Sequence, residues 1–278
     1  MKKNGIFLLA VFCFLSLFSR PVFADVGPKP SVTVIVENAP DKSYYVTLLA
    51  KKGYGPWQQV TDMEGMPVNS EEESKAAQMF LEYEDKDGFF LLNNMSSDMK
   101  GKNQFTWSYY PPEEFKIAIC CPQDGTIYVS EALEREAFYS YFRVTYGDSS
   151  LHAIEESHLG RSFLNSLLRV AVTIVVELFL AWIFGYRQKK EVLTIAIVNV
   201  ITQMILNAIL VFFDYYGGGL MWMIMFPLGE IIVFVIELII YLFTIGKRRK
   251  GRTFLYTLLA NAASAAFTFI GTVATWTK

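Results

Sequence analysis

The chain has 278 residues, 53% of them hydrophobic, and a formal net charge of only −2. Its charges are unevenly spread: residues 25–160 hold 22 acidic and 11 basic residues, a net charge of −11, and long apolar runs follow. This division predicts an acidic soluble part followed by a membrane part. The acidic balance disfavours nucleic-acid binding, which needs a basic patch.

The first 24 residues match a secretory signal peptide. Lys2 and Lys3 form a charged start, residues 6–18 are apolar, and Ala24 ends a small-residue cleavage site. The soluble part is therefore expected outside the cell, beginning at Asp25. An uncleaved membrane anchor is the open alternative, and it predicts the same orientation.

Short runs of alternating apolar and polar residues predict an all-β domain over residues 25–150. The runs are rich in β-branched and aromatic residues and are separated by Pro, Gly, Asn and Asp clusters. This pattern is typical of an immunoglobulin-like sandwich or a close relative. The predicted strands are Ser31–Glu37, Tyr44–Lys51, Gln78–Glu84, Gly88–Leu92, Gln104–Tyr109, Phe115–Cys120, Thr126–Ser130 and Phe138–Tyr146. Residues 53–75 are expected to form a long loop with at most one helical turn before Gln78, and Asp87-Gly88 a tight hairpin.

Two features of this domain are candidates for a binding site. The cluster of Trp107, Tyr109 and Tyr110 is either a ligand platform or part of the sheet core. The acidic stretch 84–88 has the composition of a calcium-binding loop, but no glutamate closes it, so a simple turn is favoured.

Cysteine and histidine residues do not indicate a metal or redox site. Adjacent Cys120 and Cys121 should lie on opposite faces of a strand, one in the core and the other half-exposed. His152 and His158 lie within residues 151–162, which are interpreted as a juxtamembrane linker. A zinc site needs more ligands than this segment offers.

Four apolar runs predict an all-α four-helix transmembrane bundle over residues 163–278. The runs cover residues 163–184, 192–213, 220–243 and 253–273, and each has about the 20 residues that cross a bilayer. The loops 185–191 and 244–252 are basic, whereas the loop between the second and third runs has no basic residue. By the positive-inside rule the basic loops are cytoplasmic. The β domain and the C-terminus are then extracellular at the plasma membrane.

Each predicted span carries one polar residue at a similar depth: Glu177, Asn199, Glu237 and Asn261. At 1.5 Å per residue, their distances from the cytoplasmic ends of the spans differ by about 3 Å. An ionisable group at such a depth normally faces the bundle interior and has a partner. No cation in the spans is placed for Glu177 or Glu237. If these two face each other, one of them should be protonated.

A second polar group is predicted nearer the outside: Arg169, Gln203, Asn207 and Glu230. An ion pair between Arg169 and Glu230 would neutralise this carboxylate. Two interpretations of the polar residues in the spans stay open. They form hydrogen bonds that hold the helices together, or they form a functional layer such as a proton- or ion-accessible cavity.

Three stretches carry a resemblance to known sequences. They are residues 25–31 (DVGPKPS) at the expected mature start, residues 109–116 (YYPPEEFK), and the polar spans with Glu177, Asn199, Gln203, Glu230 and Glu237. Together these stretches resemble a group of uncharacterised bacterial membrane proteins. The resemblance covers nearly the whole chain and implies a signal peptide, an extracellular β domain and four C-terminal spans. It implies no activity.

The candidate residues favour a binding protein over an enzyme. The spans contain no histidine and no HExxH or GxSxG motif, so no catalytic residue, metal ligand or cofactor site is predicted. The main hypothesis is a cell-surface protein whose β domain binds or senses an envelope component and whose bundle anchors it in the lipid bilayer. The alternatives are a small proton- or cation-linked transporter or channel that uses the buried carboxylates, and an assembly subunit of a larger membrane complex.

Overall fold

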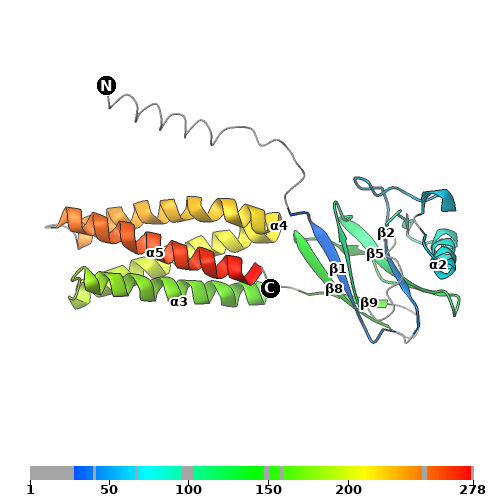
Figure 1. Cartoon of the computed structure of the whole chain (residues 1–278), viewed down its shortest axis with the longest axis horizontal. Helices are drawn as coiled ribbons and strands as arrows, with labels where there is room; N and C mark the ends of the chain where they lie inside the picture. The colour runs from blue at the N-terminus through cyan, green and yellow to red at the C-terminus, as the bar shows by residue number, and fades with distance from the viewer. Residues whose placement is uncertain are drawn as a thin grey trace, which may run out of the picture.

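The computed structural model describes residues 28–39, 42–66, 68–94, 103–146, 151–156, 159–245 and 249–276. Within these residues, a β-rich part and a bundle of long helices follow one another along the long axis of the molecule (Figure 1). A β domain followed by a helical region is therefore confirmed. The expected signal peptide, residues 1–24, lies outside the described residues.

Two β-sheets build the N-terminal part. The first has the strand order β4-β1-β8-β9 and contains β4 (Gln104–Ser108), β1 (Ser31–Glu37), β8 (Tyr139–Tyr146) and β9 (Leu151–Glu155). The second has the order β3-β2-β5-β6, with β7 paired to β5. It contains β3 (Phe90–Leu91), β2 (Tyr45–Ala50), β5 (Glu114–Cys121), β6 (Thr126–Val129) and β7 (Leu133–Glu134). Neighbouring strands are antiparallel except β1 and β8, which are parallel.

One hydrophobic core is shared by the two sheets. Val32, Val34 and Val36 enter it from β1, because every second side chain of a strand faces the same side. Phe115 of the second sheet packs edge-to-face on Phe142 of the first, with ring centroids 5.2 Å apart. The predicted alternation therefore corresponds to the faces that pack together.

A helix, α2 (Glu71–Glu82), covers the other face of the second sheet, and a short 3₁₀ helix, η1 (Met63–Gly65), precedes it. The hydroxyl of Ser70 accepts a hydrogen bond from the backbone N–H of Glu73, which caps the start of α2. Three glutamates fill the first turn, where the helix dipole favours negative charge. The predicted strand Gln78–Glu84 is therefore wrong, and the loop predicted over residues 53–75 is replaced by α2 from Glu71 onward. The capping signal and a helical apolar face outweighed the short alternating run.

The two adjacent cysteines lie on opposite faces of β5, as predicted. Cys121 faces the core between the sheets and Cys120 faces α2. Both thiols are buried, so the prediction that one is half-exposed is wrong: the unforeseen helix α2 covers that face. Burial raises the pKa of Cys120 to about 12, which keeps this thiol protonated and unreactive near neutral pH.

The acidic turn after α2 leads into β3 and does not close a β-hairpin. The Gly88 N–H donates to the Asp85 carbonyl (3.1 Å), and Gly88 has a φ of 80°. Asp85 and Asp87 both accept hydrogen bonds from the buried ammonium of Lys116, at 2.8 Å for Asp85 Oδ1. Burial alone would raise the pKa of Asp85, but the bonds from Lys116 and from two backbone N–H groups outweigh it and lower this pKa.

The predicted linker after the β domain begins inside the sheet. Residues 151–155 form β9, which pairs antiparallel with β8, and His152 lies opposite Thr145. The linker interpretation of residues 151–155 is therefore wrong, because the ladder of β8 continues onto this segment. His158 lies outside the described residues.

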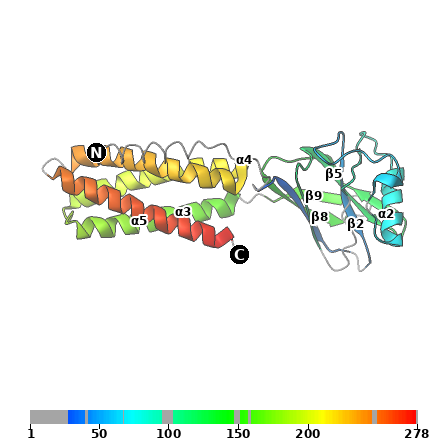
Figure 2. The same cartoon turned by 45° about the horizontal axis from the view of Figure 1, so that its top comes forward.

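Three long apolar helices form the C-terminal part: α3 (Leu159–Ile183), α4 (Lys189–Thr244) and α5 (Lys250–Trp276). All three are long and apolar enough to cross a bilayer, which supports a membrane protein. Helix α4 has a non-helical residue, Gly218, with a φ of 67°, and its two arms fold back side by side. Helix α3 ends, α4 both begins and ends, and α5 begins at the end of the bundle remote from the β domain (Figure 2).

Candidate functional site

The bundle is apolar outside and polar inside. Its outward side chains are mostly Ile, Leu, Val and Phe; Val175 of α3, for example, is 67% exposed. Its buried side chains include several amides, hydroxyls and carboxylates from all three helices. This arrangement suits helices surrounded by hydrocarbon, where polar groups must find partners inside the bundle.

Glu237 lies at the centre of the predicted polar layer and is fully buried. Thr202 Oγ1 donates to its Oε1 atom (2.7 Å), and Asn261 Nδ2 of α5 donates to its Oε2 atom (2.8 Å). One turn along the same arm of α4, Tyr241 accepts a hydrogen bond from Asn199 Nδ2 (3.0 Å). The layer therefore joins both arms of α4 to α5.

Glu177 reaches the same layer from α3 and is also fully buried. The charge of Glu237 acts on it, and the side chains of Asn199 and Ser264 face it. Even so, neither carboxylate oxygen of Glu177 makes a hydrogen bond with any described residue. The four residues of the predicted layer thus lie together. Of its two carboxylates, Glu237 has hydrogen-bond partners for both oxygens, whereas Glu177 has none among the described residues.

Three buried tyrosines beside this layer were not predicted: Tyr186, Tyr241 and Tyr256. The rings of Tyr186 and Tyr256 are 5.2 Å apart, and those of Tyr241 and Tyr256 are 6.0 Å apart. The Tyr186 hydroxyl forms a hydrogen bond with the Thr253 hydroxyl (2.9 Å). The spacing along the helix could have indicated one of these tyrosines, because Tyr241 lies one turn from Glu237 on the same face.

The predicted ion pair between Arg169 and Glu230 is wrong, because no ion pair joins them among the described residues. Arg169 donates from Nε to Asn207 Oδ1 (3.0 Å) and from Nη2 to Ser166 Oγ (2.9 Å). The carboxylate whose charge acts on it is Asp214. Helical side chains lean toward the helix N-terminus, so Arg169 reaches toward the β-domain end of α3 and away from Glu230.

The second predicted polar group therefore divides into two pairs. Arg169 pairs with Asn207, whose Nδ2 atom also donates to the Gln203 carbonyl (2.9 Å). Glu230 faces the side chain of Gln203 across the two arms of α4. Glu230 is 9% exposed, which places it at the edge of the buried interior.

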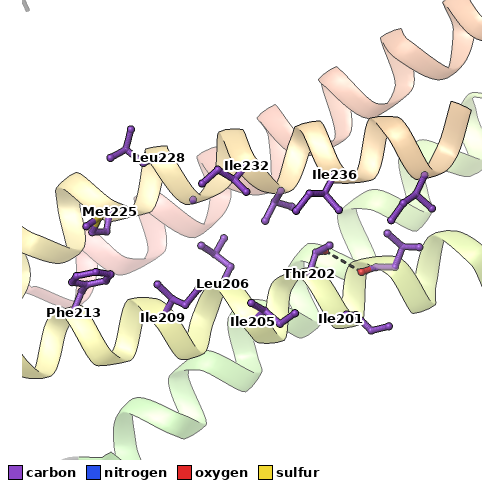
Figure 3. A pocket seen from close by; sticks show the side chains of 14 residues that line it. Ile201, Thr202, Ile205, Leu206, Ile209, Phe213, Met225, Leu228, Ile232 and Ile236 are labelled. Atoms are coloured by element: carbon purple, nitrogen blue, oxygen red, sulfur yellow. Dashed lines mark hydrogen bonds between the residues drawn. The ribbon is translucent and has the colours of Figure 1, made fainter.

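An apolar cleft of about 420 Å³ lies between the two arms of α4 (Figure 3). Ile205, Leu206 and Phe213 line one side, and Met225 and Ile232 line the other. Thr202 is the only hydroxyl-bearing residue of the lining, and it donates its hydrogen bond to the carboxylate layer. The rest of the lining is apolar, so the cleft suits an apolar group.

The β domain and the bundle meet where α4 reverses. The Phe138 N–H at the start of β8 donates to the Tyr215 carbonyl (2.8 Å). A Cβ on Gly218 would lie 2.6 Å from the Phe138 ring, so a glycine is needed there for space as well as for its positive φ. Beside this contact lies a hollow of about 490 Å³ whose lining includes four glutamates and Arg135.

The predicted aromatic cluster divides between core and surface. Trp107 is buried in the core between the two sheets, whereas Tyr109 and Tyr110 are 42% and 57% exposed just after β4. Both tyrosines have left-handed backbones, with φ values of 69° and 68°. Trp57 Nε1 donates to the Tyr109 carbonyl (2.9 Å), and the Lys29 ammonium lies 5.2 Å from the Tyr109 ring centroid.

No described group of three or more His, Cys, Asp or Glu side chains is placed to hold a metal ion. No protein-family model matches the chain, and no curated protein or solved structure matches it. The candidate sites are therefore defined by their own geometry and chemistry.

Proposed function

We propose that this chain is a multi-pass plasma-membrane protein whose extracellular β domain binds an anionic glycan of the cell envelope. The observation that carries the proposal is the exposed loop of Tyr109 and Tyr110, held in a left-handed backbone. Such a conformation costs about 1–3 kcal/mol per non-glycine residue and persists only where the surroundings impose it. The hydrogen bond from Trp57 and the contact with Lys29 supply that support.

The chemistry of the loop suits a sugar polymer with negative charge. Flat aromatic rings offer apolar faces and phenol hydroxyls, a combination enriched at binding surfaces. Lys29 lies by Tyr109, and Lys52 lies 5.2 Å from the ring centroid of Tyr54 in the turn that contains Trp57. These cations gather at one place on a domain that is acidic as a whole, which favours an anionic ligand there.

The proposed topology has four membrane crossings, formed by α3, the two arms of α4, and α5. Each arm of α4 exceeds the roughly 20 residues that a crossing needs. The described basic residues Lys189, Lys190 and Arg252 lie at helix ends remote from the β domain, so the positive-inside rule favours that end in the cytoplasm and the β domain outside. The shared two-sheet core supports an immunoglobulin-like sandwich or a relative.

The test is co-sedimentation of the full-length protein in nanodiscs with cell-wall sacculi that retain their anionic polymers. Combined Tyr109→Ala and Tyr110→Ala should weaken binding by about tenfold or more, since aromatic anchors dominate interface energies. Ile154→Ala is the matched control, because Ile154 is 68% exposed on β9 at the opposite edge of the first sheet. Equal sedimentation of the wild type and the double variant, or binding only to phosphatidylglycerol vesicles, contradicts the proposal.

Cation-linked transport, the principal alternative, has weaker support from the geometry. Its carrier residues, Glu177 and Glu237, are both closed to solvent, and hydrogen bonds to Thr202 and Asn261 engage Glu237. These bonds resemble contacts that hold helices together.

A further inference from the structure

Several buried oxygen atoms around Glu177 have no hydrogen-bond partner among the described residues, although the side chains of Asn199 and Ser264 face this carboxylate. Both oxygens of this fully buried carboxylate have no hydrogen-bond partner among the described residues. The Oδ1 atoms of Asn199 and Asn261 also have none. A buried acceptor without a partner destabilises the fold, and the effect is larger when the acceptor is charged. Four such oxygens in one layer form a set of ligands that suits a positively charged partner.

The two amides cannot supply this partner by turning over. Asn199 Nδ2 donates to the Ile195 carbonyl (3.1 Å), and Asn261 Nδ2 donates to the Thr257 carbonyl (3.1 Å). A carbonyl only accepts hydrogen bonds, so each amide nitrogen must stay where it is. The amide oxygen of each asparagine therefore faces away from that carbonyl.

No positively charged side chain of the described residues reaches the layer. Arg169 is bound to Asn207 and Ser166, and the Arg252 guanidinium lies 5.3 Å from the Tyr186 ring centroid. A proton shared between the two carboxyl groups does not replace a cation here, because it would need a hydrogen bond between Glu177 and Glu237. The two described side chains form no such bond.

We propose that Glu177, Glu237, Asn199 and Asn261 bind one alkali cation, of which Na⁺ is the simplest probe. Oxygen-only ligands match a hard cation. Calcium takes six to eight oxygen ligands and magnesium gives up its water reluctantly, so neither suits a buried site with about four free oxygens. A single charge also loses less hydration free energy on burial than a double one. The site is independent of the ligand of the β domain.

Thermal unfolding of the full-length protein in nanodiscs tests this site. The melting temperature should rise in NaCl or KCl relative to choline chloride at equal ionic strength, and the rise should saturate with cation concentration. Equilibrium dialysis with radioactive sodium should find one ion per chain in the wild type. Glu177→Gln should abolish both effects and should raise the melting temperature in choline chloride, because it removes an uncompensated buried charge.

Glu230→Gln is the matched control, a buried carboxylate on the same arm of α4 that faces Gln203. It should keep the cation response of the wild type. The proposal is overturned if the wild type melts identically in alkali and choline salts, if only calcium raises its melting temperature, or if Glu230→Gln loses the response as completely as Glu177→Gln does.

Discussion

The β domain and the bundle differ in where they place polar and apolar side chains. In the β domain, valine and phenylalanine fill the space between the sheets, and the buried Lys116 has carboxylate partners on the adjacent turn. In the bundle, isoleucine and leucine cover the outside, and carboxylates and amides lie within. The difference follows from the surrounding solvent. Water drives apolar side chains into the core, whereas hydrocarbon provides no such driving force, so apolar side chains can stay on the surface.

The largest expected effect contrasts an apolar truncation in each region. Phe115→Ala should destabilise the β domain by about 3–5 kcal/mol, because Phe115 is fully buried against Phe142 and its loss leaves a cavity. Val175→Ala should have little effect on bundle stability, because this side chain faces lipid in the proposed topology. Thermal unfolding followed by near-ultraviolet circular dichroism measures both. A similar loss for the two variants breaks the comparison.

A second test removes the buried cation of the β domain. Lys116→Ala should cost about 3–5 kcal/mol, because it leaves the buried carboxylate of Asp85 without its counter-charge. Adding Asp85→Asn should recover part of this loss. Lys42→Ala removes an exposed partner of Asp124 and should leave the melting temperature unchanged. Failure of Asp85→Asn to recover any stability argues against the charge as the cause.

The junction between the regions depends on Gly218. Gly218→Ala should destabilise it by about 1–3 kcal/mol, since alanine is strained at a φ of 67° and its Cβ would meet the Phe138 ring. Hydrogen exchange at the Phe138 amide, which donates to Tyr215, should accelerate. Gly271→Ala is the control, because nothing lies within 4 Å of the added Cβ. Unchanged exchange in Gly218→Ala shows that the contact does not hold the two regions together.

The smallest expected effect is the pH dependence of the β domain. Because the pKa of Asp85 is lowered, its ionised carboxylate stabilises the fold at pH values above its ordinary pKa of 3.8. This stabilisation is lost as the pH falls through the lowered pKa. Burial alone would lower the pKa of Lys116, but its hydrogen bonds to Asp85 and Asp87 raise it above 10.5. Its stabilisation is present below pH 10.5 and is lost as the pH rises through the raised pKa.

The measurement is the melting temperature of the β domain from acid to alkaline pH. The wild type should lose stability at both extremes. Asp85→Asn should flatten the acid side of the profile, and a profile identical to that of the wild type would contradict this role of the Asp85 carboxylate.

Local pattern was sufficient for much of the fold. β-Branched alternation predicted β1 over Ser31–Glu37 with the bounds that the structure has, and apolar length predicted the long helices. Depth counting placed Glu177, Asn199, Glu237 and Asn261 in one layer, because helical rise is regular and the predicted spans all have the same thickness to cross. These features depend on residues that are near one another in the chain.

Long-range packing decided the remainder. Residues 71–82 contain both a helical face and a short alternating run, and a free sheet face that only an apolar helix can cover selects the helix. Arg169 has several polar groups within reach, and the direction of its helix selects Asn207 over Glu230. The sequence by itself thus determined most of the strands, the long helices and the region that carries the membrane character. Only the tertiary structure decided partners, because a side chain's partner depends on distant segments that no local pattern encodes.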